Sequence, residues 1–141
     1  SDAFCVNRHR ESFLQFVRDH VDLLFANEEE LMALYQLEDI EAALDAAGNH
    51  CRFVAATRGA AGAALLTDGE RIAIEAVPPR RLLDTTGAGD LFAAGFLYGY
   101  TQKMPLEVCG QLGAAAASEI IAQYGARAER SLREVAAPLL T

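Results

Sequence analysis

Short apolar segments alternate with helix-like segments along this chain, and the alternation is the strongest constraint on its fold. Strands are predicted over residues 21–26, 52–57, 63–67 and 71–77. Helices are predicted over residues 7–20, 38–47, 88–102, 105–124 and 131–137, with a further helix starting just after Asn27. Strands separated by helices are typical of α/β proteins with a mostly parallel sheet flanked by helices. The sequence therefore predicts an α/β fold.

Turn signals and chain length refine this prediction. Asp68-Gly69 separates two predicted strands and indicates a two-residue β-hairpin. Gly48-Asn49 marks the end of the helix over 38–47. The 141 residues are 52% hydrophobic, which provides enough apolar mass for a core and fits one domain.

The charge balance restricts the partners of the chain. Twelve Lys and Arg against 20 Asp and Glu give a net charge of −8, which disfavours nucleic-acid and anionic-membrane partners. A small phosphate ligand remains compatible, because backbone amides bind phosphate. No apolar run reaches the length of a membrane span. Three widely spaced cysteines without a CxxC pair predict neither a disulfide framework nor a zinc site, and favour a cytoplasmic setting.

The segment from Leu82 to Tyr100, LLDTTGAGDLFAAGFLYGY, carries the clearest chemical signal. Gly87, Ala88 and Gly89 lie where a loop enters a helix, so their amides are expected at the positive end of the helix dipole. We therefore expect an anion hole that stabilises charge on a transferring phosphoryl group. Asp90, in the first helical turn, can accept the proton of an attacking hydroxyl. The alternative is a glycine turn with an acidic residue that only stabilises the helix start.

Common nucleotide and hydrolase motifs are absent from the sequence. A Walker A loop needs Gly-Lys, but the only lysine, Lys103, follows Gln102. Phe92 occupies the third glycine position of a GxGxxG fingerprint. No serine has the flanking glycines of a GxSxG nucleophile elbow.

The stretch DTTGAGDLFAAGF, residues 84–96, closely resembles the C-terminal signature of the ribokinase-like (PfkB) carbohydrate and nucleoside kinases. Three more stretches agree with that family in order and spacing: VDLLFANEEE, TRGAAG and PLEVCGQLGAAAASEIIAQYGAR. The adenosine kinase branch is the most similar. The resemblance implies a ribokinase-like fold in which residues 1–141 form the C-terminal nucleotide-binding portion. An N-terminal acceptor-binding and lid portion is then missing from this chain, which would leave a strand edge uncovered.

The same resemblance implies an ATP-dependent kinase. Asp90 matches the catalytic base that deprotonates a primary hydroxyl, while the amides of Gly87, Ala88 and Gly89 stabilise the moving γ-phosphoryl group. The implied acceptor is a sugar or nucleoside, with adenosine favoured, and a homodimer of the full-length protein is an implied assembly. A ribokinase- or fructokinase-like sugar kinase is one alternative. A non-catalytic nucleotide-binding fragment or degenerate relative is the other, and this chain alone is expected to be inactive.

Four residues match metal-organising positions of the family. Asn27 and Glu30 match an Asn-x-x-Glu pair that helps organise the Mg²⁺–phosphate shell, with Glu30 acting through water. The same spacing is that of a helix capping box, which forms without any metal, and the two interpretations are compatible. Asp84 and Thr86 match positions that bind a monovalent cation, K⁺, in some members.

The remaining implied contacts are with the nucleotide. Thr57, Gly59 and Gly62 match nucleotide-contacting positions in the turn after a strand, and a simple glycine turn is the alternative. Ala114 is placed beside the adenine, where several relatives carry Asn or His. An alanine can pack against a base but cannot form a hydrogen bond with it, which places purine selectivity at that edge in doubt.

Overall fold

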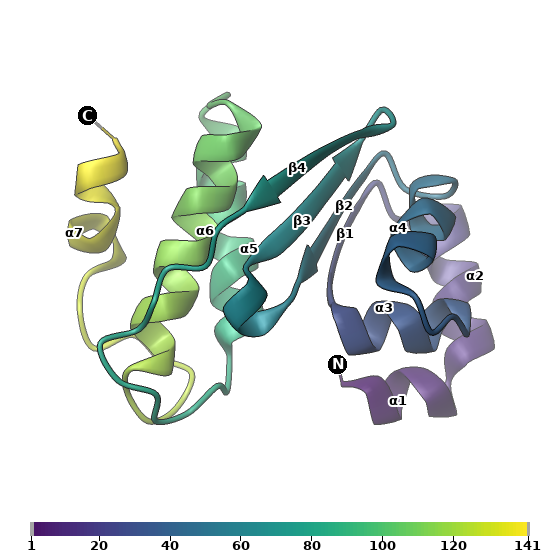
Figure 1. The fold of residues 1–141 in the computed structure, drawn as a ribbon, viewed down its shortest axis with the longest axis horizontal. Helices are drawn as coiled ribbons and strands as arrows, with labels where there is room; N and C mark the ends of the chain where they lie inside the picture. The colour runs from purple at the N-terminus through teal and green to yellow at the C-terminus, as the bar shows by residue number, and fades with distance from the viewer. Residues whose placement is uncertain (1, 141) are drawn as a thin grey trace. The chain divides into compact units, whose positions relative to one another are not determined.

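The computed structural model describes residues 2–140, which form two compact units (Figure 1). The first unit runs up to Arg58 and also includes Ala64–Ile72. The second unit comprises Gly59–Ala63 and the chain from Ala73 onwards. Both helices and strands form where the periodicity predicts them, so the α/β class is confirmed.

The first unit places a layer of helices against parallel strands. The elements are α1 (Ala3–Arg8), α2 (Arg10–His20), β1 (Leu23–Asn27), α3 (Glu28–Tyr35), α4 (Ile40–Gly48) and β2 (Phe53–Thr57). The helix predicted over 7–20 is interrupted at His9, whose φ of −122° and ψ of 26° are not helical. Its core includes Leu31, Leu44 and Val54, each at most 1% exposed.

The sheet has the strand order β1-β2-β3-β4 and is mixed rather than mostly parallel in the described residues. Strand β1 pairs with β2 in parallel, whereas β3 (Ala63–Thr67) and β4 (Glu70–Ile74) follow through short turns. The 3₁₀ turn η1 (Gly59–Ala61) is too short for a parallel crossover. Asp68 and Gly69 both have positive φ, 49° and 78°, as the predicted two-residue hairpin requires.

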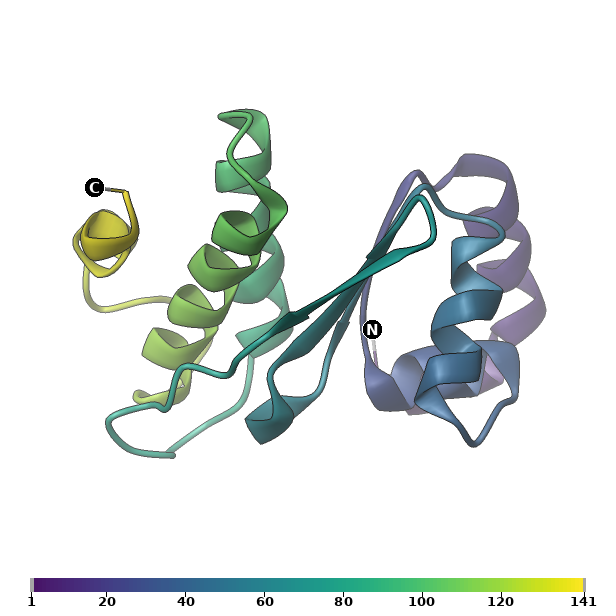
Figure 2. The ribbon, with the colours of Figure 1, turned by 45° about the horizontal axis from the view of Figure 1, so that its top comes forward.

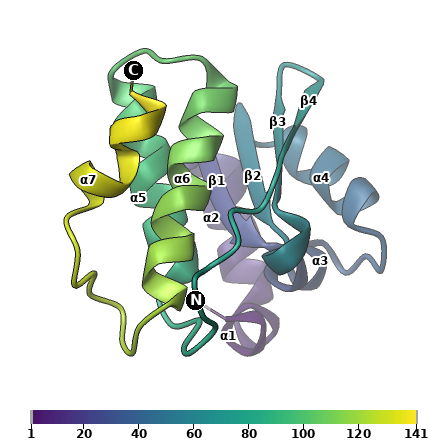
Figure 3. The same ribbon diagram turned by 60° about the vertical axis from the view of Figure 1, so that its left-hand side comes forward.

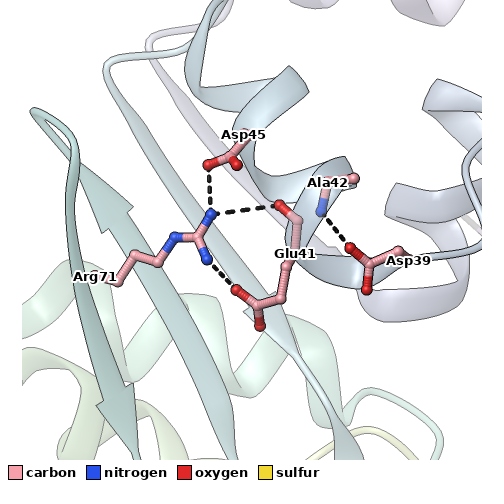
Figure 4. Close-up of polar contacts among 5 residues, drawn as sticks. All are labelled: Asp39, Glu41, Ala42, Asp45 and Arg71. Atoms are coloured by element: carbon pink, nitrogen blue, oxygen red, sulfur yellow. Dashed lines mark hydrogen bonds and ion pairs between the residues drawn. The ribbon is translucent and has the colours of Figure 1, made fainter.

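Polar contacts hold β4 and α4 together within the first unit (Figure 4). Asp39 caps α4, because its Oδ2 accepts the Ala42 N–H at 2.9 Å. Arg71 on β4 donates to the carboxylates of Glu41 and Asp45, one helical turn apart on α4. Hydrogen bonding to Asp45 is the main reason why the pKa of Arg71 is raised. Because this cluster is exposed, it aligns the hairpin more than it stabilises the unit.

The second unit is built on two long helices that lie side by side (Figures 2 and 3). Its elements are α5 (Ala88–Thr101), α6 (Leu106–Ile121), α7 (Leu132–Ala136) and η2 (Ala137–Leu139). Glycines let the α5 and α6 backbones approach closely: a Cβ on Gly95 would lie 2.5 Å from the Leu112 carbonyl oxygen, and one on Gly113 would lie 2.7 Å from that of Phe92. Within residues 2–140, none of the helices has the length and apolarity that a bilayer crossing requires.

We predict that Gly95→Ala destabilises the second unit by about 1–3 kcal/mol, because its methyl group overlaps the α6 backbone. Gly89→Ala in the same helix is the matched control. A Cβ on Gly89 meets no atom within 4 Å, and alanine is favoured over glycine in a helix by about 0.5–1 kcal/mol. Urea unfolding measures both variants. Equal stability of the two variants would contradict the close packing of α5 on α6.

Candidate active site

The loop that enters α5 is turned by Gly87, the N-cap of that helix. Gly87 has φ of 80° and ψ of 2°, a left-handed conformation that favours glycine. A Cβ at this position would lie 2.7 Å from the Ala126 Cβ, so only glycine fits. Two residues further on, Gly89 faces open space, and Asp90 is exposed in the first turn of α5. A glycine turn, an open helix start and an exposed carboxylate therefore lie within four consecutive residues.

The backbone amides of this turn are not equivalent. The Ala88 N–H donates to the Thr85 carbonyl oxygen at 3.1 Å, which closes the turn. Among residues 2–140, the Gly87 and Gly89 N–H groups make no hydrogen bond to the protein. Of the three predicted anion-hole amides, two are therefore open to a ligand, and the third holds the turn in shape.

Asp84 ties the loop before α5 to the loop after α6. Its Oδ1 accepts the Thr86 N–H at 2.9 Å, and its Oδ2 accepts the Gly125 N–H at 3.0 Å. A side-chain hydrogen bond from Thr86, followed by the backbone N–H groups of Gly125 and Thr86, lowers the pKa of Asp84. The Leu83 N–H also donates to the Ile121 carbonyl oxygen at 3.0 Å. The entry to α5 is thus fixed against the end of α6.

In the first unit, Asn27 and Thr57 lie opposite each other where parallel strands β1 and β2 end. The carboxyl ends of parallel strands are where α/β proteins bind ligands. The Asn27 Oδ1 accepts the Glu30 N–H at 2.8 Å, and the Glu30 Oε2 accepts the Asn27 N–H at 2.9 Å. The capping box is therefore present, and it fixes both side chains at this end of the strands. Beside it, Arg58 and Glu28 form an ion pair at 3.3 Å.

The other predicted nucleotide-contacting residues belong to the second unit. Gly59 and Gly62 have φ of 54° and 85°. A Cβ on Gly62 would lie 2.0 Å from the Ile74 carbonyl oxygen, so packing alone requires glycine there, whereas Gly59 faces open space. Ala114 is 8% exposed on α6, one turn after Gly110, which packs against Ile74. Only a small part of its side chain is therefore open to contact a base.

The acidic side chains that the structure describes do not form a metal cage. Within residues 2–140, no group of three or more His, Cys, Asp or Glu side chains is arranged to hold an ion. Magnesium usually keeps several waters and binds through one or two carboxylates together with substrate phosphates. A single carboxylate such as that of Glu30, beside Asn27, is compatible with magnesium bound in this way.

Sequence reasoning missed the loop after α6. Gly125 and Ala126 contact Asp84 and Gly87, although 41 residues separate the hydrogen-bonded pair. The sequence offered only a partial signal: Gly125 follows the helical pattern and has φ of 82°, which marks a glycine turn four residues after the end of α6 but not what that turn contacts.

Comparison with known proteins places this geometry in a family. The profile of the pfkB family carbohydrate kinases matches residues 5–132. A cytidine kinase from Thermococcus kodakarensis is 37% identical over 119 residues, which cover 82% of this chain and 42% of that protein.

Solved structures agree with this match. A probable sugar kinase from Rhizobium etli is 48% identical with a TM-score of 0.94, covering 99% of this chain and 43% of its own. An adenosine kinase from Sinorhizobium meliloti is 43% identical with a TM-score of 0.94, covering 98% of this chain and 42% of its own. The chain thus spans less than half the length of these relatives. Its fold is the predicted ribokinase-like α/β fold, and the chain belongs to the pfkB family of carbohydrate kinases.

Proposed function

We propose that this chain is the nucleotide-binding portion of a kinase that transfers the γ-phosphate of ATP to a primary hydroxyl of a sugar or nucleoside. The observation that carries the proposal is the start of α5, where the exposed Asp90 carboxylate lies within one turn of the Gly87 and Gly89 amides, which have no partner among residues 2–140. Family membership supports it. Because the chain spans 42–43% of the matched relatives, the acceptor contacts are assigned to a portion outside residues 1–141.

In this proposal Asp90 takes the proton of the acceptor hydroxyl. The Gly87 and Gly89 amides, at the positive end of α5, stabilise the negative charge that builds up on the phosphoryl group. The Ala88 amide acts indirectly, since its bond to the Thr85 carbonyl oxygen shapes the turn. Phosphoryl transfer depends mainly on alignment and charge neutralisation, which a preformed turn of this kind supplies.

The nucleotide and its metal are assigned to the predicted residues. Thr57, Gly59 and Gly62 contact the nucleotide, and Ala114 packs near the base without a hydrogen bond to it. Mg²⁺, when bound, supplies charge neutralisation at the phosphates. Asn27 and Glu30 orient water around that shell, and their capping box restricts both side chains.

The acceptor is proposed to be a nucleoside, with adenosine favoured. This proposal is supported by matched relatives that are named cytidine kinase and adenosine kinase. A sugar acceptor is the second candidate, because the probable sugar kinase from Rhizobium etli shares 48% of its aligned residues with this chain. Transfer from ATP to adenosine, cytidine, ribose and fructose by the full-length protein separates the two.

A monovalent cation is proposed beside Asp84 and Thr86. Both Asp84 oxygens already accept backbone N–H groups, so a cation there would share oxygens that also hold the loop. Replacing K⁺ by choline in the transfer assay lowers the rate if this assignment holds, and an unchanged rate would refute it.

We predict that Asp90→Asn lowers kcat by about 10²–10⁴-fold, because the amide cannot take the hydroxyl proton. ATP binding is expected to stay nearly intact, since the Gly87 and Gly89 amides are unchanged. Glu107→Gln is the matched control: Glu107 is an exposed acidic residue in the first turn of α6. Near-normal turnover of Asp90→Asn would rule out the assigned base. Tight ATP binding without turnover by the unmodified protein would favour the non-catalytic alternative.

The hydrogen bonds that the Asp84 carboxylate accepts from Thr86 and Gly125, here called the Asp84 tie, predict that stability depends on pH. Because folding lowers the pKa of Asp84, the unfolded chain binds its proton more readily, and the tie stabilises the fold most above about pH 4. Its contribution is lost as the pH falls through the lowered pKa. We therefore expect the difference in free energy of unfolding between the unmodified protein and Asp84→Asn to become smaller below about pH 4. Urea unfolding at several pH values tests this, and a gap that widens in acid would be inconsistent with the tie.

A further inference from the structure

Gln123, just beyond the end of α6, is a buried polar side chain that the proposed chemistry does not use. It is only 5% exposed. Its Nε2 donates to the Arg127 carbonyl oxygen, and its Oε1 accepts the Glu129 N–H at 2.9 Å. Both ends of the carboxamide are therefore engaged by the loop that follows. One side chain fixes the path of residues 124–129.

That loop forms the support behind Gly87. The Gly125 N–H donates to the Asp84 carboxylate at 3.0 Å, and Ala126 lies so close to Gly87 that no side chain fits between them. Moving the loop would release one oxygen of Asp84 and remove the wall against which Gly87 packs. The position of the loop thus bears directly on the entry to α5.

We propose that Gln123 is a positioning residue for phosphoryl transfer, which it supports by holding the loop that contacts Asp84 and Gly87. The inference rests on the proposed function for its catalytic consequence, and on the hydrogen bonds alone for its structural part. Gln123 acts through two links: its carboxamide sets the loop, and the loop sets the turn that presents the Gly87 and Gly89 amides. Without Gln123, the Arg127 carbonyl oxygen and the Glu129 N–H lose the partner that fixes them, and because both residues are exposed, water takes its place and the loop is free to move.

Gln123→Met isolates this role, because methionine has a similar volume but makes neither hydrogen bond. Gln123→Glu is the second variant. It keeps an acceptor for the Glu129 N–H and loses the donor to the Arg127 carbonyl oxygen. If the methionine variant folds poorly, this variant provides the test instead. Gln111→Met is the matched control, since Gln111 is an exposed glutamine on α6.

Amide hydrogen exchange of this chain is the first readout. In Gln123→Met we expect about tenfold faster exchange at Glu129, spreading to Gly125 and Leu91, whose N–H bonds to the Gly87 carbonyl oxygen. Gln123→Glu should retain protection at Glu129, and Gln111→Met should match the unmodified chain. Faster exchange confined to Glu129 would overturn the proposal, because it would show that a change in the loop does not alter the turn at Gly87.

Turnover of the full-length protein is the second readout. We expect Gln123→Met to lower kcat by about tenfold with little change in the acceptor KM, because the acceptor contacts are elsewhere. An unchanged kcat in an active enzyme would overturn the proposal. If the unmodified protein transfers no phosphate, the proposed function fails, whereas the exchange pattern still decides whether Gln123 positions the turn.

Discussion

The carboxylate of Asp84 holds together two loops that are distant in the sequence, and the candidate site depends on this contact. One oxygen shapes the turn that leads to Gly87, and the other reaches Gly125 beyond the end of α6. Because Gly87 also packs directly against Ala126, the first amides of α5 are presented by a structure fixed from both sides. An anion site built on backbone N–H groups needs such rigidity, since its donors cannot adjust as flexible side chains do.

Two residues of the first unit, Asn27 and Glu30, carry a structural role and a proposed metal-organising role. Asn27 and Glu30 form a capping box, which accounts for their spacing without a ligand. Their position is informative nonetheless: Asn27 is paired with Thr57 where two parallel strands end, the usual location of ligands in α/β proteins. In the function we propose, the cap that restrains the Glu30 side chain also places it to orient water around a metal. The capping role and the proposed metal-organising role are therefore compatible at this position.

Local chemistry explains which parts of the fold were predictable. Asp68-Gly69 required a hairpin because both residues tolerate positive φ, and Gly87 required a turn for the same reason. The break at His9 was not predictable, since residues 7–12 contain neither the glycine nor the proline that commonly marks a helix end. The sheet was expected to be mostly parallel, but the short η1 turn and the hairpin make it mixed. The contact between Asp84 and Gly125 could not be predicted, because it depends on how α5 and α6 pack. No local sequence pattern shows that two residues 41 positions apart will meet.

We propose above all that the open amides at the start of α5 receive the phosphates of the nucleotide. Titration of the isotopically labelled full-length protein with ATP and Mg²⁺, followed by amide chemical shifts, tests it most directly. The account predicts that the resonances of Gly87 and Gly89 move most and saturate with the bound nucleotide, while that of Ala88 moves less because its N–H is already bonded to Thr85. Saturable binding that leaves Gly87 and Gly89 unshifted would contradict the account.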